Sequence, residues 1–396
     1  MRYKIFFVFL LAIIVRIPFL FLSGYPDDMQ YFTTWSSALG EHGIRSFYVL
    51  FRGDQLSFPS YALYAPMLWG IGSGGLLKIP ILFFDIVSGV LLYFFLKGQE
   101  KGKSIVITAA YLFNPALLYA GIVWGQVDTI VTFFVFFALI LVVYKRFSFA
   151  WLALVTAVLV KPQALFFAPL LLLLTIREKQ WRTLYTLLPS IFFFGIVTVF
   201  YLGFDIVRVV SELFRTVERY PYLSVNAFNI WFPLTYAAQG FISDNTALFH
   251  FLSPRFIGIV LFSFFYGMIG RFIWRRPAVA NGGDFSIIFF SAAFVAFAGF
   301  MVLTQMHERY LYPFFLLATP LLLSSRSWRI VWAMLSVSFL LNLFIAFPLP
   351  SGTSLVLLRV CIFFGMAINI IVFAWSISFL LSSLHDDQRL HRSANT

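Results

Sequence analysis

Long apolar runs alternate with short polar segments along almost the whole chain. A helix needs about 20 apolar residues to cross a bilayer, and most of the runs approach that length. The pattern predicts an all-α, polytopic membrane protein with about 11–13 transmembrane helices. We expect the spans near residues 5–22, 76–96, 104–121, 129–144, 148–160, 163–176, 184–203, 256–274, 285–304, 310–325, 330–347 and 355–383.

The segment 58–72 is apolar but brief, and Pro59, Pro66 and several glycines interrupt it. It could form a helix in the interface, a re-entrant element or a short span. If this segment does not cross the membrane, the main basic clusters all fall on one side of it. These clusters are Arg2/Lys4, Lys97/Lys101/Lys103, Lys145/Arg146, Arg177/Lys179/Arg182, Arg271/Arg275/Arg276, Arg326/Arg329 and Arg389/Arg392. Because cationic loops remain in the cytoplasm, both termini are predicted to be cytoplasmic.

The first apolar run, which ends at Leu22, is long and contains Arg16. No small-residue cleavage site follows it, so the pattern predicts an uncleaved first helix rather than a signal peptide. Together with the later spans, this favours a multi-pass protein of the cell (cytoplasmic) membrane.

Composition supports the same class. Hydrophobic residues make up 61% of the chain and charged residues 11%, whereas soluble proteins have about 25% charged residues. The net charge of +12 comes from clusters beside the spans, so the expected partners are membrane lipids and no nucleic acid. The single cysteine, Cys361, excludes a disulfide framework, and lipid-facing bulk is the simplest explanation of the 53 phenylalanines. We expect one integral-membrane domain, residues 1–396.

Two of the loops on the outward face are long, at residues 23–57 and 204–255, and have room for short interfacial helices. Residues 208–219 follow an amphipathic helical pattern that fits such a helix. The polar motifs of the chain all fall on this outward face, which favours a site at one membrane surface.

The adjacent acids Asp27 and Asp28 follow the first apolar run. Asp28 at the lipid boundary could act as a general base on a hydroxyl, with Asp27 as a secondary candidate. Alternatively, Asp27 caps a helix that starts at Asp28 or Met29, with Asp28 in the first turn. The two interpretations are compatible.

Residues 306–313 lie between two apolar runs and contain His307, Glu308, Arg309 and Tyr310. Arg offers paired donors that suit a phosphate, and a neighbouring His can add another. The alternative is a solvated loop in which Glu308 and Arg309 neutralise each other. Lys161 splits a long apolar stretch and either snorkels to the surface or reaches a phosphate.

Further polar side chains fall on the same outward side, and Trp124 to Asp128 form one of the expected turns. Inside the second span, Lys78 and Asp85 are seven residues apart and would share a helix face, as a structural pair or as a proton site. The expected substrate-binding residues are Trp35, Gln126, Asp128, Gln163, Asn226, Asn229, Trp231, Glu308 and Tyr310.

The chain resembles the GT-C superfamily of glycosyltransferases over roughly residues 25–313. It is most similar to bacterial and archaeal mannosyltransferase-like members, and more distantly to dolichyl-phosphate-glucose-dependent glucosyltransferases. The resemblance is carried by the order of Asp28 with Trp35, Leu39, Gly43 and Phe47-Tyr48, then Leu77-Lys78-Ile79-Pro80, Asn114-Pro115, Trp124-Gly125-Gln126-Val127-Asp128, Lys161-Pro162-Gln163, Ser224 with Asn226, Asn229-Ile230-Trp231 and His307-Glu308-Arg309-Tyr310.

This resemblance implies an inverting transferase that moves one sugar, mannose by family frequency, from a polyprenyl-phosphate donor on the outer face of the membrane. It implies that Asp28 is the general base and that His307, Arg309 and, less directly, Lys161 hold the donor phosphate. Family glucosyltransferases carry Lys where this chain has Arg309. No large soluble domain follows the spans, which favours a lipid-linked glycan or an envelope polymer as acceptor.

A metal cofactor is not required by this scheme, although Asp27, Asp28 or Asp128 could recruit a divalent ion. The alternative function is a membrane transporter or lipid-glycan flippase. It would explain Arg16, Lys78 and Asp85 as charges along a path through the membrane, but it predicts inverted repeats and broken helices at the midplane, which the sequence does not show.

Overall fold

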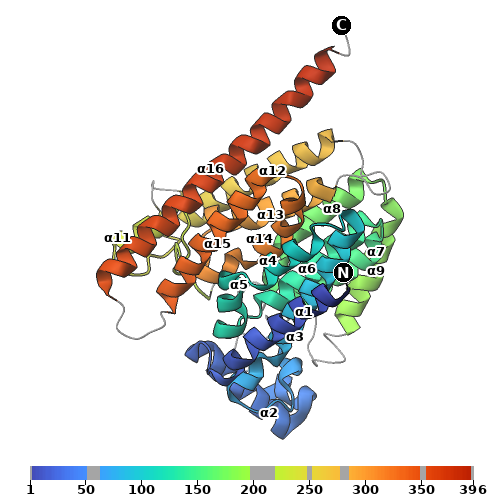
Figure 1. The fold of residues 1–396 in the computed structure, drawn as a ribbon. Coiled ribbons are helices and arrows are strands. Elements are labelled where there is room, and N and C mark those ends of the chain that lie inside the picture. The colour runs from blue at the N-terminus through green and yellow to red at the C-terminus, as the bar shows by residue number, and fades with distance from the viewer. Residues whose placement is uncertain are drawn as a thin grey trace. The chain divides into compact units, whose positions relative to one another are not determined.

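A computed structural model describes residues 2–50, 63–196, 219–247, 252–276, 285–347 and 354–393. These residues form helices and connecting turns, with isolated β-bridges and no strand (Figure 1). Among them, 6 helices are long and apolar enough to cross a membrane, or up to 7 if one bent pair counts as a span. The predicted class, an all-α multi-pass membrane protein, is confirmed at this level.

Six expected spans match these long helices within a few residues. The helical spans are Tyr3–Phe21, Gly74–Gln99, Pro254–Arg275, Phe285–Val302, Arg326–Ala346 and Leu355–Leu384. The expected span 104–121 is instead a pair, Ser104–Leu112 and Pro115–Gly125, bent by 44°. Three further apolar helices are shorter, Asp128–Val143, Phe147–Val160 and Pro162–Arg177, so the larger predicted number of spans stays a prediction.

The contacts divide the chain into two compact units, and the first comprises Met1–Ala168 and Trp181–Arg219. Its helices are α1 (Arg2–Arg16), α2 (Pro26–Leu50), α3 (Ile79–Gln99), α4 (Ser104–Leu112), α5 (Pro115–Leu118), α6 (Asp128–Val143), α7 (Phe147–Val160) and α9 (Trp181–Ile196). Only three residues separate α6 from α7, and the two helices pack closely as a hairpin. The start of α6 therefore lies beside the end of α7.

A buried arginine joins three helices of this unit. Arg16 is fully buried, and its Nε donates to Asp85 Oδ2 at 2.7 Å. Its other nitrogens donate to the carbonyl oxygens of Ala12 at 2.9 Å and Leu112 at 2.7 Å. The predicted Lys78–Asp85 pair is wrong, because Lys78 lies in a 3-10 turn before α3 and donates to Phe19 O at 2.6 Å. The helical spacing that suggested the pair does not hold there.

The segment 58–72 makes no long helix in its described part, residues 63–72. Ala65–Leu68 form a single 3-10 turn, and the Leu68 carbonyl accepts a hydrogen bond from Ser36 Oγ of α2 at 2.9 Å. Leu63 N donates to Leu159 O of α7 at 3.0 Å. Residues 63–72 therefore pack against the middle of α2 and the end of α7 and do not span on their own.

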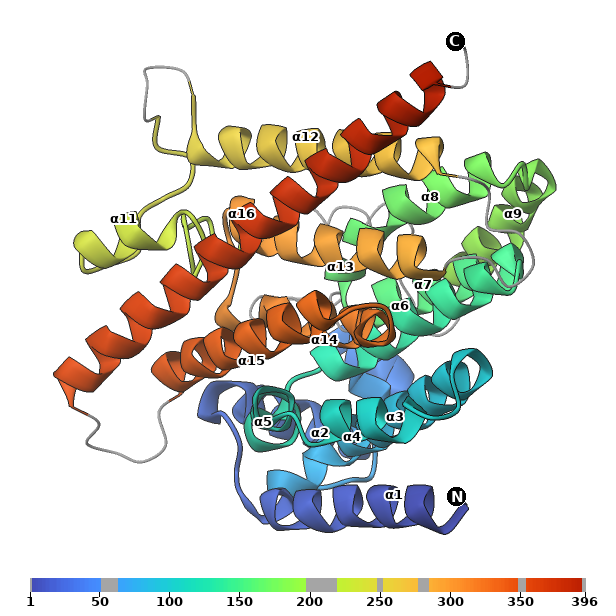
Figure 2. The same cartoon turned by 45° about the horizontal axis from the view of Figure 1, so that its top comes forward.

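The second unit comprises Pro169–Gln180 and Tyr220–Thr396. It contains most of α8 (Ala168–Arg177), and α11 (Phe232–Ala237), α12 (Pro254–Arg275), α13 (Phe285–Val302), α14 (Tyr312–Ala318), α15 (Arg326–Ala346) and α16 (Leu355–Ser393). The long helix α16 packs on α15, α12 and α13 (Figure 2). α11 is a short helix within the second long loop, whereas α2 occupies most of the first loop with 25 residues and a break at Gly43. Their predicted place in the membrane interface stays a prediction. The predicted amphipathic helix over 208–219 lies outside the described residues except for Arg219.

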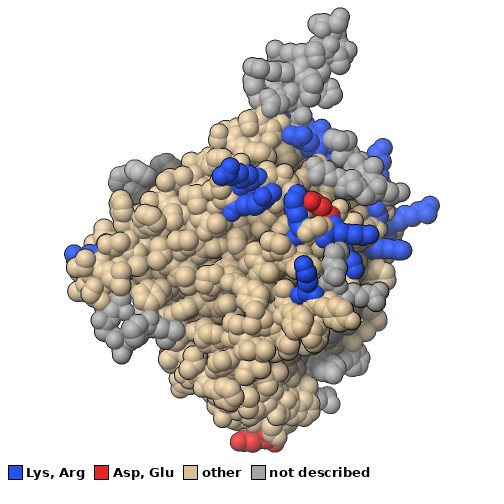
Figure 3. Space-filling view, viewed as in Figure 1, with Lys and Arg blue, Asp and Glu red and all other residues tan. Residues whose placement is uncertain are grey.

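Phenylalanine builds the core of this unit as well as its lipid-facing surface. Phe294 of α13 contacts Phe265 of α12 and Phe373 of α16, with ring centroids 5.8 and 6.3 Å apart. On α16, Phe363 is 77% exposed, and much of the surface in Figure 3 carries no charged side chain. Lipid-facing bulk thus explains only part of the phenylalanine content.

Candidate functional site

The first candidate group is the start of α2, which begins at Pro26. Proline is favoured at the first position of a helix, and acids in the first turn interact favourably with the helix dipole. Asp27 and Asp28 both lie in that turn, so the predicted role of Asp27 as the cap of a helix starting at Asp28 or Met29 is wrong. Asp27 is exposed, whereas Asp28 is half-buried.

The segment Trp124–Asp128 approaches Asp28 because the chain breaks its helix twice before it. Asn114 caps α5 through a hydrogen bond from Ala116 N at 2.9 Å, and Pro115 follows it. Tyr119–Gly125 then form a π-helical turn, a feature often found at functional sites. Gly125 ends the turn with φ +96°, where a Cβ would lie 2.6 Å from Met29 Cε. The positive φ favours glycine here, because L side chains rarely adopt this backbone conformation.

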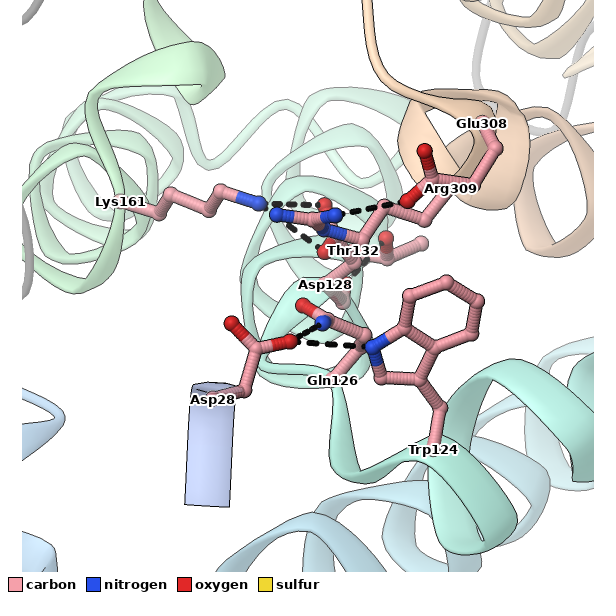
Figure 4. A network of polar contacts seen from close by, with 8 residues as sticks. All are labelled: Asp28, Trp124, Gln126, Asp128, Thr132, Lys161, Glu308 and Arg309. Carbon is pink, nitrogen blue, oxygen red and sulfur yellow. Dashed lines mark hydrogen bonds and ion pairs between the residues drawn. The ribbon is translucent and has the colours of Figure 1, made fainter. Parts of the chain in front are cut away.

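Two donors from this segment bind one oxygen of the Asp28 carboxylate (Figure 4). Trp124 Nε1 donates to Asp28 Oδ2 at 3.0 Å, and Gln126 Nε2 donates to the same oxygen. The indole of Trp124 is buried and stacks on Tyr25, with ring centroids 4.7 Å apart. Asp28 Oδ1 receives no hydrogen bond from the described residues. Within the described part of the chain, the carboxylate is thus held through Oδ2 alone.

The same segment ends in a buried ion pair. Lys161 Nζ lies 2.9 and 3.0 Å from the two carboxylate oxygens of Asp128. Lys161 is 1% exposed, so it does not snorkel to the surface, and that prediction is wrong. The physical reason is the hairpin of α6 and α7, which places an acid at a helix start beside a lysine that follows a helix end.

The second candidate group, in the other unit, surrounds His307. Val225 and Asn226 form bridges with His307, and Val225 N donates to Met306 O at 2.9 Å. The ring of Tyr220 packs edge-on against that of His307, with centroids 5.0 Å apart. These contacts join the loop that contains Asn226 to the loop that contains Glu308 and Tyr310. Both loops carry predicted substrate-binding residues.

Glu308 and Arg309 form an ion pair, with Arg309 Nη1 2.7 Å from Glu308 Oε1. The pair agrees with the alternative in which the two charges neutralise each other. Glu308 is buried, however, so the predicted solvated loop is wrong for this residue. The arginine is half-buried, and its guanidinium lies 5.7 Å from the ring centre of Tyr310.

Asn229 and Trp231 hold this loop in place. Asn229 Oδ1 accepts from the amides of Trp231 and Phe232 at 3.1 Å, and Asn229 Nδ2 donates to Leu303 O at 3.1 Å. Trp231 Nε1 donates to Val302 O at 2.8 Å. These polar atoms are engaged with the backbone, so the structure gives both residues a role in loop position, and their role in substrate binding stays a prediction.

No family model and no curated protein matches this chain. The assignment of the site therefore rests on its own geometry. In the first unit the structure brings together Asp28, Gln126, Asp128 and Lys161, and in the second unit it brings together Asn226, His307, Glu308 and Tyr310. Trp35 is buried beside Phe32, with ring centroids 5.5 Å apart, and Gln163 is half-buried in the 3-10 turn after Lys161.

Sequence reasoning missed Asp244, which anchors the loops around His307. Asp244 is fully buried and accepts from Arg255 Nε at 3.0 Å, Thr304 Oγ1 at 2.8 Å and Gln305 Nε2 at 2.9 Å. The only sequence signal was the scarcity of acids in the chain. Among the described residues, no group of three or more His, Cys, Asp or Glu side chains could hold a metal ion.

Proposed function

We propose that this protein is a GT-C-like, membrane-embedded glycosyltransferase that moves one sugar from a polyprenyl-phosphate donor to a lipid-linked or cell-envelope glycan, with its site on the outer face of the membrane. The observation that carries the proposal is the Asp28 carboxylate, which two donors hold through Oδ2 while Oδ1 accepts no hydrogen bond from the described residues. Mannose is the first donor sugar to test.

In the proposed reaction, the oxygen of the acceptor hydroxyl attacks the anomeric carbon of the donor sugar. Asp28 Oδ1 takes the proton of that hydroxyl at the same time. The bond from that carbon to the phosphate oxygen breaks, and the polyprenyl phosphate leaves with the electron pair. A positioned base of this kind contributes about 10²–10⁴-fold to the rate. His307 and Arg309 supply donors and charge that stabilise the leaving phosphate.

For transport, the alternative, the structure supplies one feature and removes one argument. The bent pair Ser104–Leu112 and Pro115–Gly125 is a broken helix of the kind that transport predicts. Its argument rested on Arg16, Lys78 and Asp85 as charges along a path, but Arg16 and Asp85 are buried and paired, and Lys78 donates to a backbone carbonyl. The Arg16 contacts join α1, α3 and α4, and the Lys78 contact joins the 3-10 turns Gly74–Lys78 and Ile17–Phe21.

The test is sugar transfer in membranes supplied with radiolabelled polyprenyl-phosphate mannose or glucose. Asp28→Asn keeps the shape of the side chain but removes the base, so we expect transfer to fall by about 10²-fold or more at equal expression. Asp27→Asn makes the same change on the exposed neighbour and separates the two candidate bases. Transfer that is retained in Asp27→Asn and lost in Asp28→Asn assigns the base to Asp28.

Full transfer by Asp28→Asn would overturn the assignment of the base. If the wild-type protein transfers sugar from neither donor, while movement of a labelled lipid-linked glycan across the membrane depends on it, the flippase alternative is correct.

A further inference from the structure

Asp128 and Lys161 form an ion pair in which both side chains are buried, the first 6% and the second 1% exposed. The free-energy cost of removing two charges from water can exceed the attraction between them. A buried ion pair is therefore weak evidence that the pair stabilises the folded protein. Such pairs can instead specify one arrangement of the surrounding chain. The place of this pair in the fold indicates which arrangement that is.

Asp128 follows Gln126 by two residues, and Gln126 donates to the Asp28 carboxylate. Figure 4 shows Gln126 between Asp28 on one side and the Asp128–Lys161 pair on the other. The segment is therefore anchored at both ends, to the start of α2 through Asp28 and to the end of α7 through Lys161. Gly125 and the extended backbone of Gln126 leave this stretch outside regular α-helix. Two backbone hydrogen bonds hold it, from Tyr25 N to Trp124 O at 3.0 Å and from Gln126 N to Ala120 O at 3.2 Å, and the side-chain anchors at Asp28 and Lys161 add to them.

We propose that the Asp128–Lys161 ion pair is a positioning device that keeps the Trp124 and Gln126 donors aimed at the Asp28 carboxylate. This inference rests on the proposed function, and it changes the role of Lys161 from a ligand of the donor phosphate to a positioning residue. Asp128 likewise positions the segment instead of binding the sugar.

The two roles of Lys161 predict different kinetics. A lysine that binds the donor phosphate in the ground state contributes to donor affinity, so its removal raises KM for the donor. A lysine that stabilises only the leaving phosphate would lower kcat, as a positioning residue does, and hydrogen exchange of Trp124–Asp128 separates these two roles. A positioning residue acts on the reacting geometry, where a displacement of about 1 Å can cost about 10²-fold in rate. Its removal lowers kcat and leaves KM for the donor nearly unchanged.

The chain offers a matched control in the same unit. Arg16 and Asp85 also form a buried ion pair, with N–O distance 2.7 Å and side chains 1% and 4% exposed. That pair joins α1, α3 and α4, and neither partner contacts Trp124, Gln126 or Asp28 in the described hydrogen bonds.

The experiment compares two neutral double variants with the wild-type protein. Lys161→Met with Asp128→Asn removes one pair without leaving a buried lone charge, and Arg16→Met with Asp85→Asn does the same for the other. We expect the first to lower kcat by about 10²-fold with KM for the donor within twofold, and the second to keep kcat per folded molecule. Lys161→Arg alone keeps a cation opposite Asp128, so this variant should retain most of the wild-type kcat.

A second readout is independent of transfer. Hydrogen exchange in detergent, followed by mass spectrometry, should speed up in peptides covering Trp124–Asp128 in the Lys161→Met/Asp128→Asn variant and not in the control variant. Unchanged exchange in that segment, or a rise in KM for the donor that accounts for the lost activity, would overturn the positioning role. Absence of transfer in the wild-type protein would instead overturn the proposed function, and exchange alone would then decide whether the pair holds the segment.

Discussion

At the scale of single residues, the Asp28 carboxylate shows what a sequence can and cannot supply. An acid beside an apolar run in an acid-poor chain was visible as a candidate base. The sequence did not show which residues donate hydrogen bonds to it, because Trp124 and Gln126 are 96 and 98 residues away along the chain. Their approach depends on the positive φ of Gly125, which a single sequence does not reveal.

The indole donor can be tested separately from the acid. Trp124→Phe removes Nε1 and keeps an aromatic ring against Tyr25. A hydrogen bond to a charged group contributes about 1.5–3 kcal/mol, so we expect kcat for sugar transfer to fall by about 10–100-fold. Trp69→Phe, which changes an exposed indole of the same unit, should leave kcat unaltered. Equal rates for both variants and the wild type would show that the indole does not hold the base.

At the scale of elements, the hydrophobic pattern located the long helices well, because a span is determined by a local run of apolar residues. It failed where partners come from elsewhere in the chain. The spacing of Lys78 and Asp85 suggested a pair within one helix, whereas Asp85 binds Arg16 of α1. Asn114-Pro115 were visible as a break, but the π-helical turn after them was not.

Asp244 ties three elements of the second unit together, namely its own loop, the start of α12 and the residues before His307. Asp244→Ala leaves Arg255, Thr304 and Gln305 without this acceptor, so we expect the free energy of unfolding to fall by about 2–3 kcal/mol. Thermal unfolding in detergent measures the loss. Asn245→Ala, at the exposed neighbouring position, should unfold like the wild type.

At the scale of the whole molecule, the class follows from composition, and the charge distribution predicts the orientation. The 6 long apolar helices agree with a multi-pass protein, and the distribution of Lys and Arg predicts both termini in the cytoplasm. The pairing of residues across each unit could not be derived in this way, because apolar runs of similar composition carry no information on which neighbour they contact.

Orientation is tested by labelling single cysteines in intact cells. With Cys361 replaced by Ala, a cysteine at Gln239 should react with an impermeant maleimide from outside, and one at Lys101 should react only after lysis. Both positions are exposed, so access through the protein does not limit the reaction. The opposite pattern would invert the predicted topology.

Helix α13 is apolar on every side, and 89% of its spanning window is buried inside the protein. During insertion it enters the bilayer as readily as a lipid-exposed helix, and it must later exchange lipid for its neighbours α12, α14 and α16. Bilayer thickness therefore acts on this helix only before assembly is complete. In the folded protein, a change in lipid composition acts directly on helices that are exposed to lipid, such as α1 and α16.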